Sequence, residues 1–203
     1  LDSTSNDDTL KVNPYGCYGS ISGEYIVGVG AGADVPNITT AFFIGSMCGV
    51  NGNVTLKLQN GVYNENWDFT GLADIMGNYT LTIKSLSGNK DSVILRPTTG
   101  AGITLNNTNN LIIKDITINN AISTGYGIQF TGAAKNIEIR NNKFVGDLTG
   151  TSAATSPAPI YKPTSTGIAN NIRIIGNSIE GGYYGIYFYA GVGTAVGEYG
   201  TQI

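Results

Sequence analysis

The chain has 203 residues, of which only 12% are charged, and a formal net charge of −3 at pH 7. The length fits one domain, the small negative charge gives no basic surface for nucleic acid, and no apolar run is long enough to span a membrane. Because histidine is absent, Ser-His-Asp and Cys-His nucleophiles and histidine-ligated metal sites are excluded.

The first predicted elements are a strand at residues 25–27 and a helix at residues 37–48. The glycine-rich segment between them, residues 28–34, lacks the Gly-x-Gly-x-x-Gly spacing of a dinucleotide loop, and no βαβ unit follows, so we interpret it as a turn. Apolar residues recur on one face of the helix, and Asn37 is a suitable N-cap. We expect this helix to cover the N-terminal end of the strands that follow, because an open end exposes unpaired strand edges.

The two cysteines, Cys17 and Cys48, are too few to form a structural zinc site. In an exported chain they would pair as a disulfide, and the alternative is two unrelated buried thiols. A disulfide would tie the leading segment of the chain to the predicted helix.

A nine-residue phrase occurs three times, at residues 110–118, 136–144 and 171–179, with intervals of 136 − 110 = 26 and 171 − 136 = 35 residues. Each copy predicts a strand, a sharp bend and a second strand, because apolar residues alternate and the fifth position holds Asp, Asn or Gly, which tolerate a positive φ. The residues expected to stack inside are Leu111, Ile113, Ile137, Ile139, Ile172 and Ile174, and those expected at the bends are Asp115, Asn141 and Gly176.

A shorter phrase at residues 102–105, 127–130 and 185–188 supplies a third strand to each repeat. Residues 150–167 explain the longer second interval, because their prolines and many Ser and Thr residues predict a loop that does not pair as a strand. Three strands and three bends per repeat predict an all-β fold, a parallel β-helix with a short N-terminal capping helix. We place the N-terminal segment and its helix at residues 1–52 and the coils at residues 53–203.

The elements that open the coils resemble those of a known group of proteins. After the helix come a Val-Thr-Leu-x-Leu strand at residues 54–58, a Gly-x-Tyr-x-Glu turn at residues 61–65, and strands at residues 81–83 and 92–95. This order resembles the first coils of pectin-lyase-like proteins. The resemblance implies a right-handed, single-stranded parallel β-helix, a fold frequent in secreted and surface proteins of Bacteroidetes-type bacteria. The superfamily includes lyases, hydrolases, esterases and non-catalytic adhesins, so the resemblance does not fix an activity.

Lyases of this superfamily use clustered carboxylates for Ca²⁺ and an Arg or Lys as the base. The nearest approach to such a cluster is Asp115 with Lys114 and Arg140, but Asp115 occupies a bend position. We interpret Glu138 and Arg173, which share one column, as an ion pair on the outer face. The sequence therefore offers only weak catalytic candidates and no metal site, and Ca²⁺ is expected only if the protein is a lyase.

Tyrosine residues crowd the last part of the chain. If Ile186 and Phe188 point inward, strand alternation turns Tyr187 and Tyr189 outward, and the repeat places Gln129 in the column of Tyr187. Aromatic faces beside an amide fit a sugar, whose rings have apolar faces and hydroxyl edges. The candidate ligand-binding residues are Gln129, Tyr184, Tyr187 and Tyr189. The alternative is that the tyrosines cover the C-terminal end of the coils or contact a further domain of the same chain.

These observations favour a non-catalytic scaffold of an exported bacterial protein, extracellular or at the cell surface, that acts in adhesion or glycan binding. Its expected partner is a glycan or another cell-surface molecule, and no cofactor is expected. The alternative function is that of a polysaccharide lyase or glycoside hydrolase acting on an acidic, plant or host polysaccharide.

Overall fold

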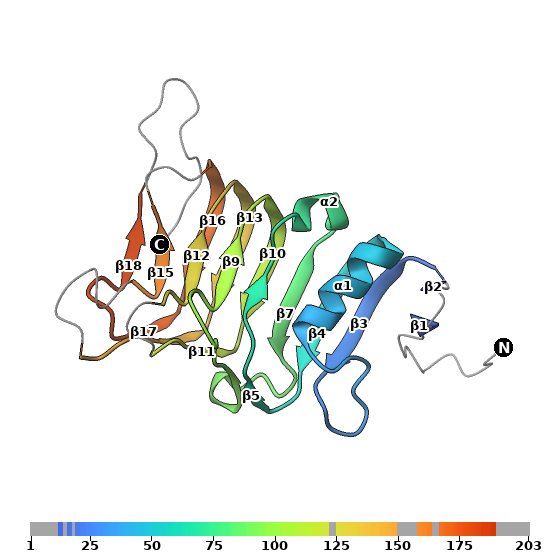
Figure 1. The fold of residues 1–203 in the computed structure, drawn as a ribbon, viewed down its shortest axis with the longest axis horizontal. Coiled ribbons are helices and arrows are strands. Elements are labelled where there is room, and N and C mark those ends of the chain that lie inside the picture. The colour runs from blue at the N-terminus through green and yellow to red at the C-terminus, as the bar shows by residue number, and fades with distance from the viewer. Residues whose placement is uncertain are drawn as a thin grey trace.

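The computed structural model describes residues 12–13, 16–17, 19–121, 125–149, 158–163 and 167–189. The chain winds through successive coils, whose strands pair in parallel to form three sheets (Figure 1). The coils stack along the long axis of the molecule, from β3 (Ile21–Val27) at one end to β16 (Ala169–Ile175) and β18 (Ile186–Phe188) at the other. The protein is therefore an all-β parallel β-helix.

Each sheet takes one strand from each successive coil. Sheet I contains, in spatial order, β3, β4 (Val50–Leu58), β7 (Leu81–Ser85), β10 (Thr108–Lys114), β13 (Ala134–Arg140) and β16. Sheet II contains β5 (Gly61–Tyr63), β8 (Val93–Leu95), β11 (Thr117–Asn119), β14 (Lys143–Val145) and β17 (Ser178–Glu180). Sheet III contains β6 (Trp67–Asp68), β9 (Ile103–Leu105), β12 (Ile128–Phe130), β15 (Ile160–Lys162) and β18.

The smaller elements lie toward the N-terminal end or in the connections. β1 (Val12–Asn13) and β2 (Gly16–Cys17) form an antiparallel pair. Helix α2 (Leu72–Met76) follows β6, and a 3₁₀ turn, η1 (Lys90–Ser92), precedes β8. Among the helices in the described part of the chain, none is long and apolar enough to cross a membrane.

The bend between sheets I and II has the conformation that the repeat predicts. Asp115, Asn141 and Gly176 have φ angles of 58°, 53° and 64°. Asp, Asn and Gly adopt this left-handed conformation at lower cost than other residues, because they have a short polar side chain or none. In these three coils, one residue therefore turns the chain from sheet I into sheet II.

A second row of left-handed residues lies within the strands of sheet I and was not predicted. Asn110, Asn136 and Asn171 have φ angles between 53° and 56°. The side-chain amide of Asn136 donates to the Oδ1 atom of Asn110 at 2.8 Å, and that of Asn171 donates to the Oδ1 atom of Asn136 at 2.9 Å. The asparagine that begins each repeated phrase therefore has a structural role, which is to link one coil to the next.

The apolar columns stack inside in the predicted register. Leu111 pairs with Ile137 and Ile137 with Ile172, while Ile113 pairs with Ile139 and Ile139 with Ile174. All six side chains are buried. Side chains two residues apart point to the same face of a strand, so the strands of successive coils bring these side chains together in one continuous core.

Two asparagines lie beside this core and satisfy backbone groups at the bend. The Asn142 side chain, which is fully buried, donates to the Ile113 carbonyl oxygen at 2.9 Å and accepts from the Ile116 N–H at 3.2 Å. Asn177 donates in the same way to the Ile139 carbonyl oxygen at 2.8 Å. A buried backbone group without a partner costs about 1–3 kcal/mol, so these amides stabilise the two bends between sheets I and II at which they lie.

The expectation that residues 150–167 do not pair as a strand is wrong. Residues Ile160–Lys162 form β15, which pairs in parallel with β12 on one side and β18 on the other. Pro159 and Pro163 lie immediately outside the strand, where the missing N–H group does not interrupt the ladder. The insertion therefore contains one complete strand of the coil, and sheet III is continuous.

Helix α1 (Ile38–Cys48) follows the glycine-rich turn. Its N-cap is Asn37, whose Oδ1 atom accepts a hydrogen bond from the Thr40 N–H at 2.8 Å. Its buried face contacts the first coils, and Phe42 meets Phe69 edge to face with ring centroids 5.8 Å apart. A small apolar cavity of about 30 Å³ lies between the helix and these coils. The role of α1 as a cap for the β-helix stays a prediction.

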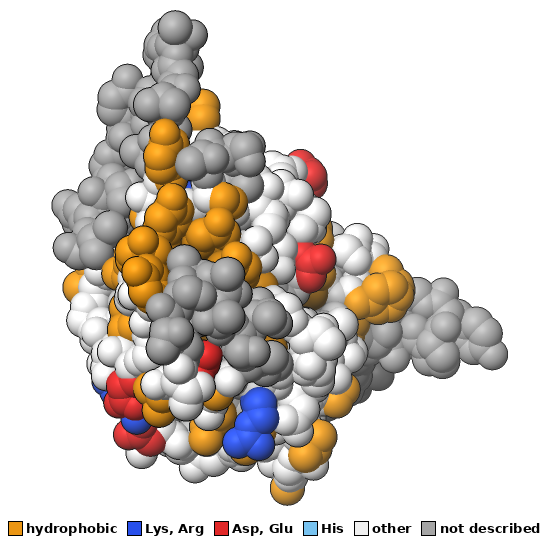
Figure 2. Space-filling model, turned by 60° about the vertical axis from the view of Figure 1, so that its left-hand side comes forward, with side chains coloured by type: hydrophobic (Ala, Val, Ile, Leu, Met, Phe, Trp, Pro, Cys, Tyr) orange, Lys and Arg blue, Asp and Glu red, His pale blue; other side chains and the backbone are white. Residues whose placement is uncertain are grey.

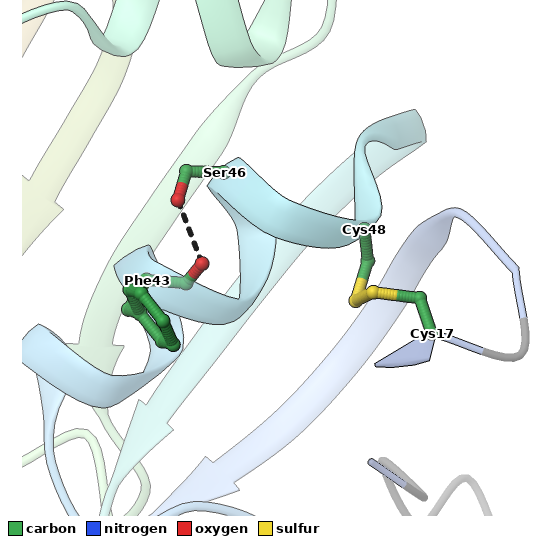
Figure 3. Close-up of a disulfide and its surroundings, with 4 residues drawn as sticks. All are labelled: Cys17, Phe43, Ser46 and Cys48. Carbon is green, nitrogen blue, oxygen red and sulfur yellow. Dashed lines mark hydrogen bonds between the residues drawn. A yellow bond between two sulfur atoms is a disulfide. The ribbon is translucent and has the colours of Figure 1, made fainter. Parts of the chain in front are cut away.

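Cys17 and Cys48 form a disulfide (Figure 3). Cys17 belongs to β2, and Cys48 is the last residue of α1. The bond joins residues 31 positions apart, so it fastens the leading segment to the helix. In the same helix the Ser46 hydroxyl donates to the Phe43 carbonyl oxygen at 2.7 Å.

Shortening a side chain in the buried columns should lower the stability of the protein strongly. Ile139→Ala should lower the free energy of unfolding by about 2–5 kcal/mol, because Ile139 is fully buried and its loss leaves a cavity. Urea unfolding measures this change. Ile112→Ala is the matched control, since Ile112 lies on the outer side of the neighbouring strand and should cost much less. Equal losses in the two variants would contradict the assigned core.

The disulfide predicts a second stability effect. Replacing both cysteines, Cys17→Ser with Cys48→Ser, should lower the free energy of unfolding by about 3–4 kcal/mol, because the unfolded chain gains the freedom of a loop of about 30 residues. Urea unfolding of the oxidised protein and the variant tests this value, and mass analysis of the unreduced protein should detect no free thiol. An unchanged unfolding midpoint would show that the bond does not constrain the unfolded chain.

Candidate functional site

The outer face of sheet III carries one row of side chains that changes in character along the molecule. The strand register places Asp68, Thr104, Gln129, Tyr161 and Tyr187 one after another on successive coils. Neighbouring strands lie about 4.8 Å apart, so adjacent members of the row are close enough for contact. The row is polar at its N-terminal end and aromatic at its C-terminal end.

Five tyrosines form a continuous chain of ring contacts on this side, called the tyrosine cluster below. Tyr126, which precedes β12, stacks on Tyr161 with ring centroids 4.2 Å apart and planes inclined by 10°. Tyr161 stacks on Tyr187 at 5.4 Å and 30°. Tyr184 contacts Tyr187 at 5.5 Å, and Tyr183 meets Tyr184 edge to face at 4.8 Å. Aromatic rings attract each other at such separations, so the cluster is a cohesive unit.

The ring contacts determine which parts of the tyrosine cluster a ligand can reach. Tyr161 stacks between the rings of Tyr126 and Tyr187, so its faces are covered. Tyr183 and Tyr184 are 51% and 45% exposed. Figure 2 turns the C-terminal coils toward the viewer and shows hydrophobic side chains, a class that includes tyrosine, gathered on this end of the molecule. The accessible aromatic faces therefore belong mainly to Tyr183 and Tyr184.

A glycine turn presents these two tyrosines. Gly181 and Gly182 have φ angles of 77° and 85°, which other residues rarely adopt. A Cβ atom on Gly181 would lie 2.8 Å from the Gly146 carbonyl oxygen, so a larger residue does not fit there. The Gly182 N–H donates to the Asp147 carbonyl oxygen at 2.9 Å. The turn is thus fixed to the preceding coil rather than free in solvent.

The hydroxyl groups of the cluster add polar chemistry. Burial raises the pKa of Tyr126, and the neighbouring Tyr161 raises it further through its charge and a hydrogen bond. The Tyr126 hydroxyl therefore stays protonated well above neutral pH and keeps its ability to donate. Farther along the row, the amide of Gln129 on β12 and the hydroxyl of Thr104 on β9 provide further hydrogen-bonding groups.

The candidate binding residues expected from the sequence lie in this region, but they are not all adjacent to one another. Gln129 and Tyr187 share a row, yet Tyr161 of β15 lies between them. Tyr184 and Tyr187 are in contact. Tyr189 follows β18, is half-buried, and donates its N–H to the Lys162 carbonyl oxygen at 3.1 Å; its ring makes no contact with another ring in the described part of the chain. Tyr161 was missed because residues 150–167 were interpreted as a loop, and Tyr126 was missed because it joins the cluster by stacking on Tyr161.

A lysine lies on the inner side of sheet III, opposite the row. Lys162 is 1% exposed and pairs with Phe188 in the ladder, in the column where the core otherwise holds large apolar side chains such as Phe130. Its Nζ atom donates to the Tyr189 carbonyl oxygen at 3.0 Å and lies 5.7 Å from the centre of the Phe188 ring. These contacts lie directly behind Tyr187, so they help to hold β18 in place.

The weak catalytic candidates are engaged in structural contacts. The Oδ1 atom of Asp115 accepts a hydrogen bond from the Asn141 amide at 2.6 Å, and its Oδ2 atom lies 3.9 Å from the Lys114 Nζ atom. Arg140 does not pair with Asp115 but with Glu138, at 3.1 Å. The Asp115 carboxylate therefore has a structural role: Asp115 adopts the left-handed conformation at the bend, and its side chain links this bend to the next one through Asn141.

Glu138 lies between two arginines. Its other oxygen accepts from Arg173 on the next coil at 2.9 Å, which is the outward ion pair that the sequence indicates. In the described ranges, no group of three or more His, Cys, Asp or Glu residues is arranged to hold a metal ion. These carboxylates are therefore explained by charge pairing on the surface.

A second concave surface, of about 430 Å³, lies near the other end of the β-helix, between the glycine-rich turn and the residues after β5. The Gln59 side chain accepts from the Gly30 N–H at 2.8 Å and donates to the Ala31 carbonyl oxygen at 2.9 Å. Glu65 accepts a hydrogen bond from the Thr39 hydroxyl at 3.1 Å at the start of α1. These side chains of the cleft hold the turn and the helix together, which is a structural role.

Tyr63, which lines this cleft, should make the stability of the protein depend on pH. Burial, and then the charge of Glu65, raise the pKa of Tyr63 to about 12, and its hydroxyl donates to the carbonyl oxygens of Val27 and Gln59. Because the pKa is higher in the folded state, this contribution to stability is complete below about pH 10 and is lost as the pH rises toward 12. Urea unfolding across this range should show the decline.

Tyr63→Phe should make that decline shallower, because the variant has no phenol to titrate at this position. Tyr79→Phe is the matched control at an exposed tyrosine and should leave the slope as in the wild type. An identical slope in the wild type and Tyr63→Phe would contradict the assigned role of Tyr63.

Comparisons of the chain with protein-family models, curated proteins and solved structures found no match. Any assignment of function therefore depends on the chemistry of the described residues.

Proposed function

We propose that this protein is a non-catalytic β-helix scaffold that binds glycans on the tyrosine cluster. The observation that carries the proposal is the pair of exposed rings, Tyr183 and Tyr184, which a glycine turn holds at the end of a packed aromatic row. A fixed aromatic face binds the apolar face of a sugar ring without a large loss of side-chain freedom.

Polar groups beside the aromatic faces suit the rest of a sugar. The Tyr187 ring contacts Tyr184, and the row continues through Tyr161 to Gln129 and Thr104. Sugar hydroxyls need both donors and acceptors, which phenol, amide and hydroxyl groups provide. A linear oligosaccharide would then lie along the axis of the coils, with one ring on the exposed tyrosines and the next over the polar part of the row.

The same proposal includes export from a bacterial cell and membership of the pectin-lyase-like superfamily. The Cys17–Cys48 disulfide supports export, because such bonds form and persist mainly in oxidising compartments. The three stacked parallel sheets are compatible with the superfamily. The inferred location is the cell surface or the extracellular space, where a glycan or another cell-surface molecule is the partner.

A polysaccharide lyase or glycoside hydrolase is the alternative. The contact between Asp115 and Lys114 is the nearest arrangement to a catalytic pair in the described residues, but Asn141 also binds this carboxylate at the bend. Incubation with uronate polymers, with and without Ca²⁺, would reveal a lyase by the ultraviolet absorbance of unsaturated products. We expect no such absorbance.

The glycan proposal predicts the effect of removing both exposed rings. Tyr183→Ala with Tyr184→Ala should weaken binding on a glycan array at least about tenfold, because two aromatic contacts are lost. The melting temperature should change little, since both side chains are about half exposed. Tyr79→Ala is the matched control, an exposed tyrosine outside the cluster, and should bind like the wild type.

Two outcomes would contradict the proposal. A wild-type protein that binds no glycan on the array would make the cluster structural, and so would a Tyr183→Ala/Tyr184→Ala variant that unfolds. Tyr161→Ala helps to interpret the result, because this ring stacks between two others and its loss should lower stability as well as binding.

A further inference from the structure

A row of four cations runs along the outer face of sheet I, a different sheet from the one that carries most of the tyrosine cluster. The register pairs Lys57 with Lys84, Lys84 with Lys114, and Lys114 with Arg140. These residues, called the cation row below, lie on four successive coils about 4.8 Å apart. All four side chains are partly or well exposed to solvent.

The net charge of this face is opposite in sign to the net charge of the whole chain. The strands of sheet I hold six of the chain's 11 Lys and Arg residues and only two acids, which gives 6 − 2 = +4, whereas the chain carries −3. The six cations are Lys57, Lys84, Lys114, Lys135, Arg140 and Arg173, and the two acids are Glu24 and Glu138. Positive charge is therefore concentrated on one sheet of an acidic protein.

This arrangement does not favour folding. Like charges directly opposite each other on neighbouring strands destabilise a sheet, and the cation row contains three such pairs in succession. Acids relieve the ends of the row: Glu24 binds Lys57, and Glu138 binds Arg140. In the middle, Lys114 lies 3.9 Å from Asp115. Lys84 makes no ion pair with another described residue, although, after the hydrogen bond and the charge of Lys57, its charge helps to lower the pKa of Glu24. The centre of the row thus retains positive charge, which a bound anion would neutralise.

The column beside the cation row suits the uncharged part of a polymer. Thr55, Thr82 and Ile112 lie in register next to Lys57, Lys84 and Lys114. They form a narrow strip of hydroxyl and methyl groups without charge over three coils. The row is one cation wide and straight, so it matches a single line of anions. A nucleic-acid duplex presents a wider, two-stranded array of phosphates.

We propose that the cation row is a binding site for a linear anionic polysaccharide that lies along the axis of the β-helix. The anions of the polymer, carboxylate or sulfate, pair with Lys84 and Lys114, and the sugar rings lie on the neighbouring strip. This site is on a different sheet from the tyrosine cluster, so the protein holds an anionic glycan there independently of the glycan-binding site proposed above.

The test compares two double variants that change the net charge equally, from −3 to −5. Lys84→Gln with Lys114→Gln removes the centre of the row. Arg96→Gln with Lys143→Gln is the control, because Arg96 follows β8 and Lys143 lies in β14, both outside sheet I. Calorimetry at low salt would measure binding of a heparin oligosaccharide for sulfate, a polygalacturonate oligosaccharide for carboxylate, uncharged dextran, and DNA.

We expect the wild type to bind at least one anionic polysaccharide in a salt-sensitive manner and to bind dextran and DNA much more weakly. The Lys84/Lys114 variant should bind roughly tenfold more weakly, and the control variant within about twofold of the wild type. The Lys84/Lys114 variant should be at least as stable as the wild type, since repulsion is removed. The Tyr183→Ala/Tyr184→Ala variant should bind the polyanion normally, which separates this site from the tyrosine cluster.

Three results would overturn the proposal. The first is a wild-type protein that binds neither anionic polysaccharide. The second is an equal loss of binding in the two double variants, which would reflect net charge alone. The third is binding of DNA as tight as that of the polysaccharides, which would show that the row does not select a sugar polymer.

Discussion

Backbone hydrogen bonds between successive coils hold the strands of this protein in register, and the positions of its functional side chains depend on that register. A residue on one strand lies about 4.8 Å from its equivalent on the next, so any side chain that recurs at the same position in the repeat becomes a row. Inside, the rows are Leu and Ile, and they form the core. At the bends they are Asp, Asn and Gly with positive φ angles, which turn the chain from one sheet to the next. A shift of one residue would send the core face outward, so the buried columns fix the outer rows as well.

The outer faces then differ from sheet to sheet. Sheet III carries a polar row that ends in tyrosines, and sheet I carries a row of cations. In both cases a linear arrangement suits a linear polymer parallel to the axis of the coils. The tyrosine cluster is cohesive because its rings stack on each other, whereas the centre of the cation row is self-repelling. The first arrangement therefore contributes to folding and fits the glycan binding proposed above, whereas the second gains stability only if an anion binds, as the further proposal requires. These faces lie on the rigid body of the fold, which limits the conformational freedom lost on binding.

The sequence predicts the repeated part of this structure well and the unrepeated part poorly. The columns of Leu111 and Ile113 are predictable because alternation and the three-fold phrase agree. Strand β15 was missed, because Pro159 and Pro163 suggest a loop, although they flank the strand rather than interrupt it. Lys162 also occupies an inward position, where the alternating pattern usually places an apolar residue. Tyr161 was therefore missed as the centre of the tyrosine cluster. The cation row was only half visible, since Lys114 and Arg140 lie within the repeated phrase, whereas Lys57 and Lys84 precede it and their register depends on the fold.

The most direct test of this account is an amide chemical-shift titration of one labelled sample with two ligands, a neutral oligosaccharide selected on the array and an anionic one. The account predicts two separate responses. The neutral ligand should shift the amides around Tyr184 and Tyr187, the anionic ligand should shift those around Lys84 and Lys114, and saturation with one ligand should leave the response to the other unchanged. Shifts of the same amides by both ligands, or shifts confined to sheet II, would contradict the claim that the stacked coils present two independent binding rows.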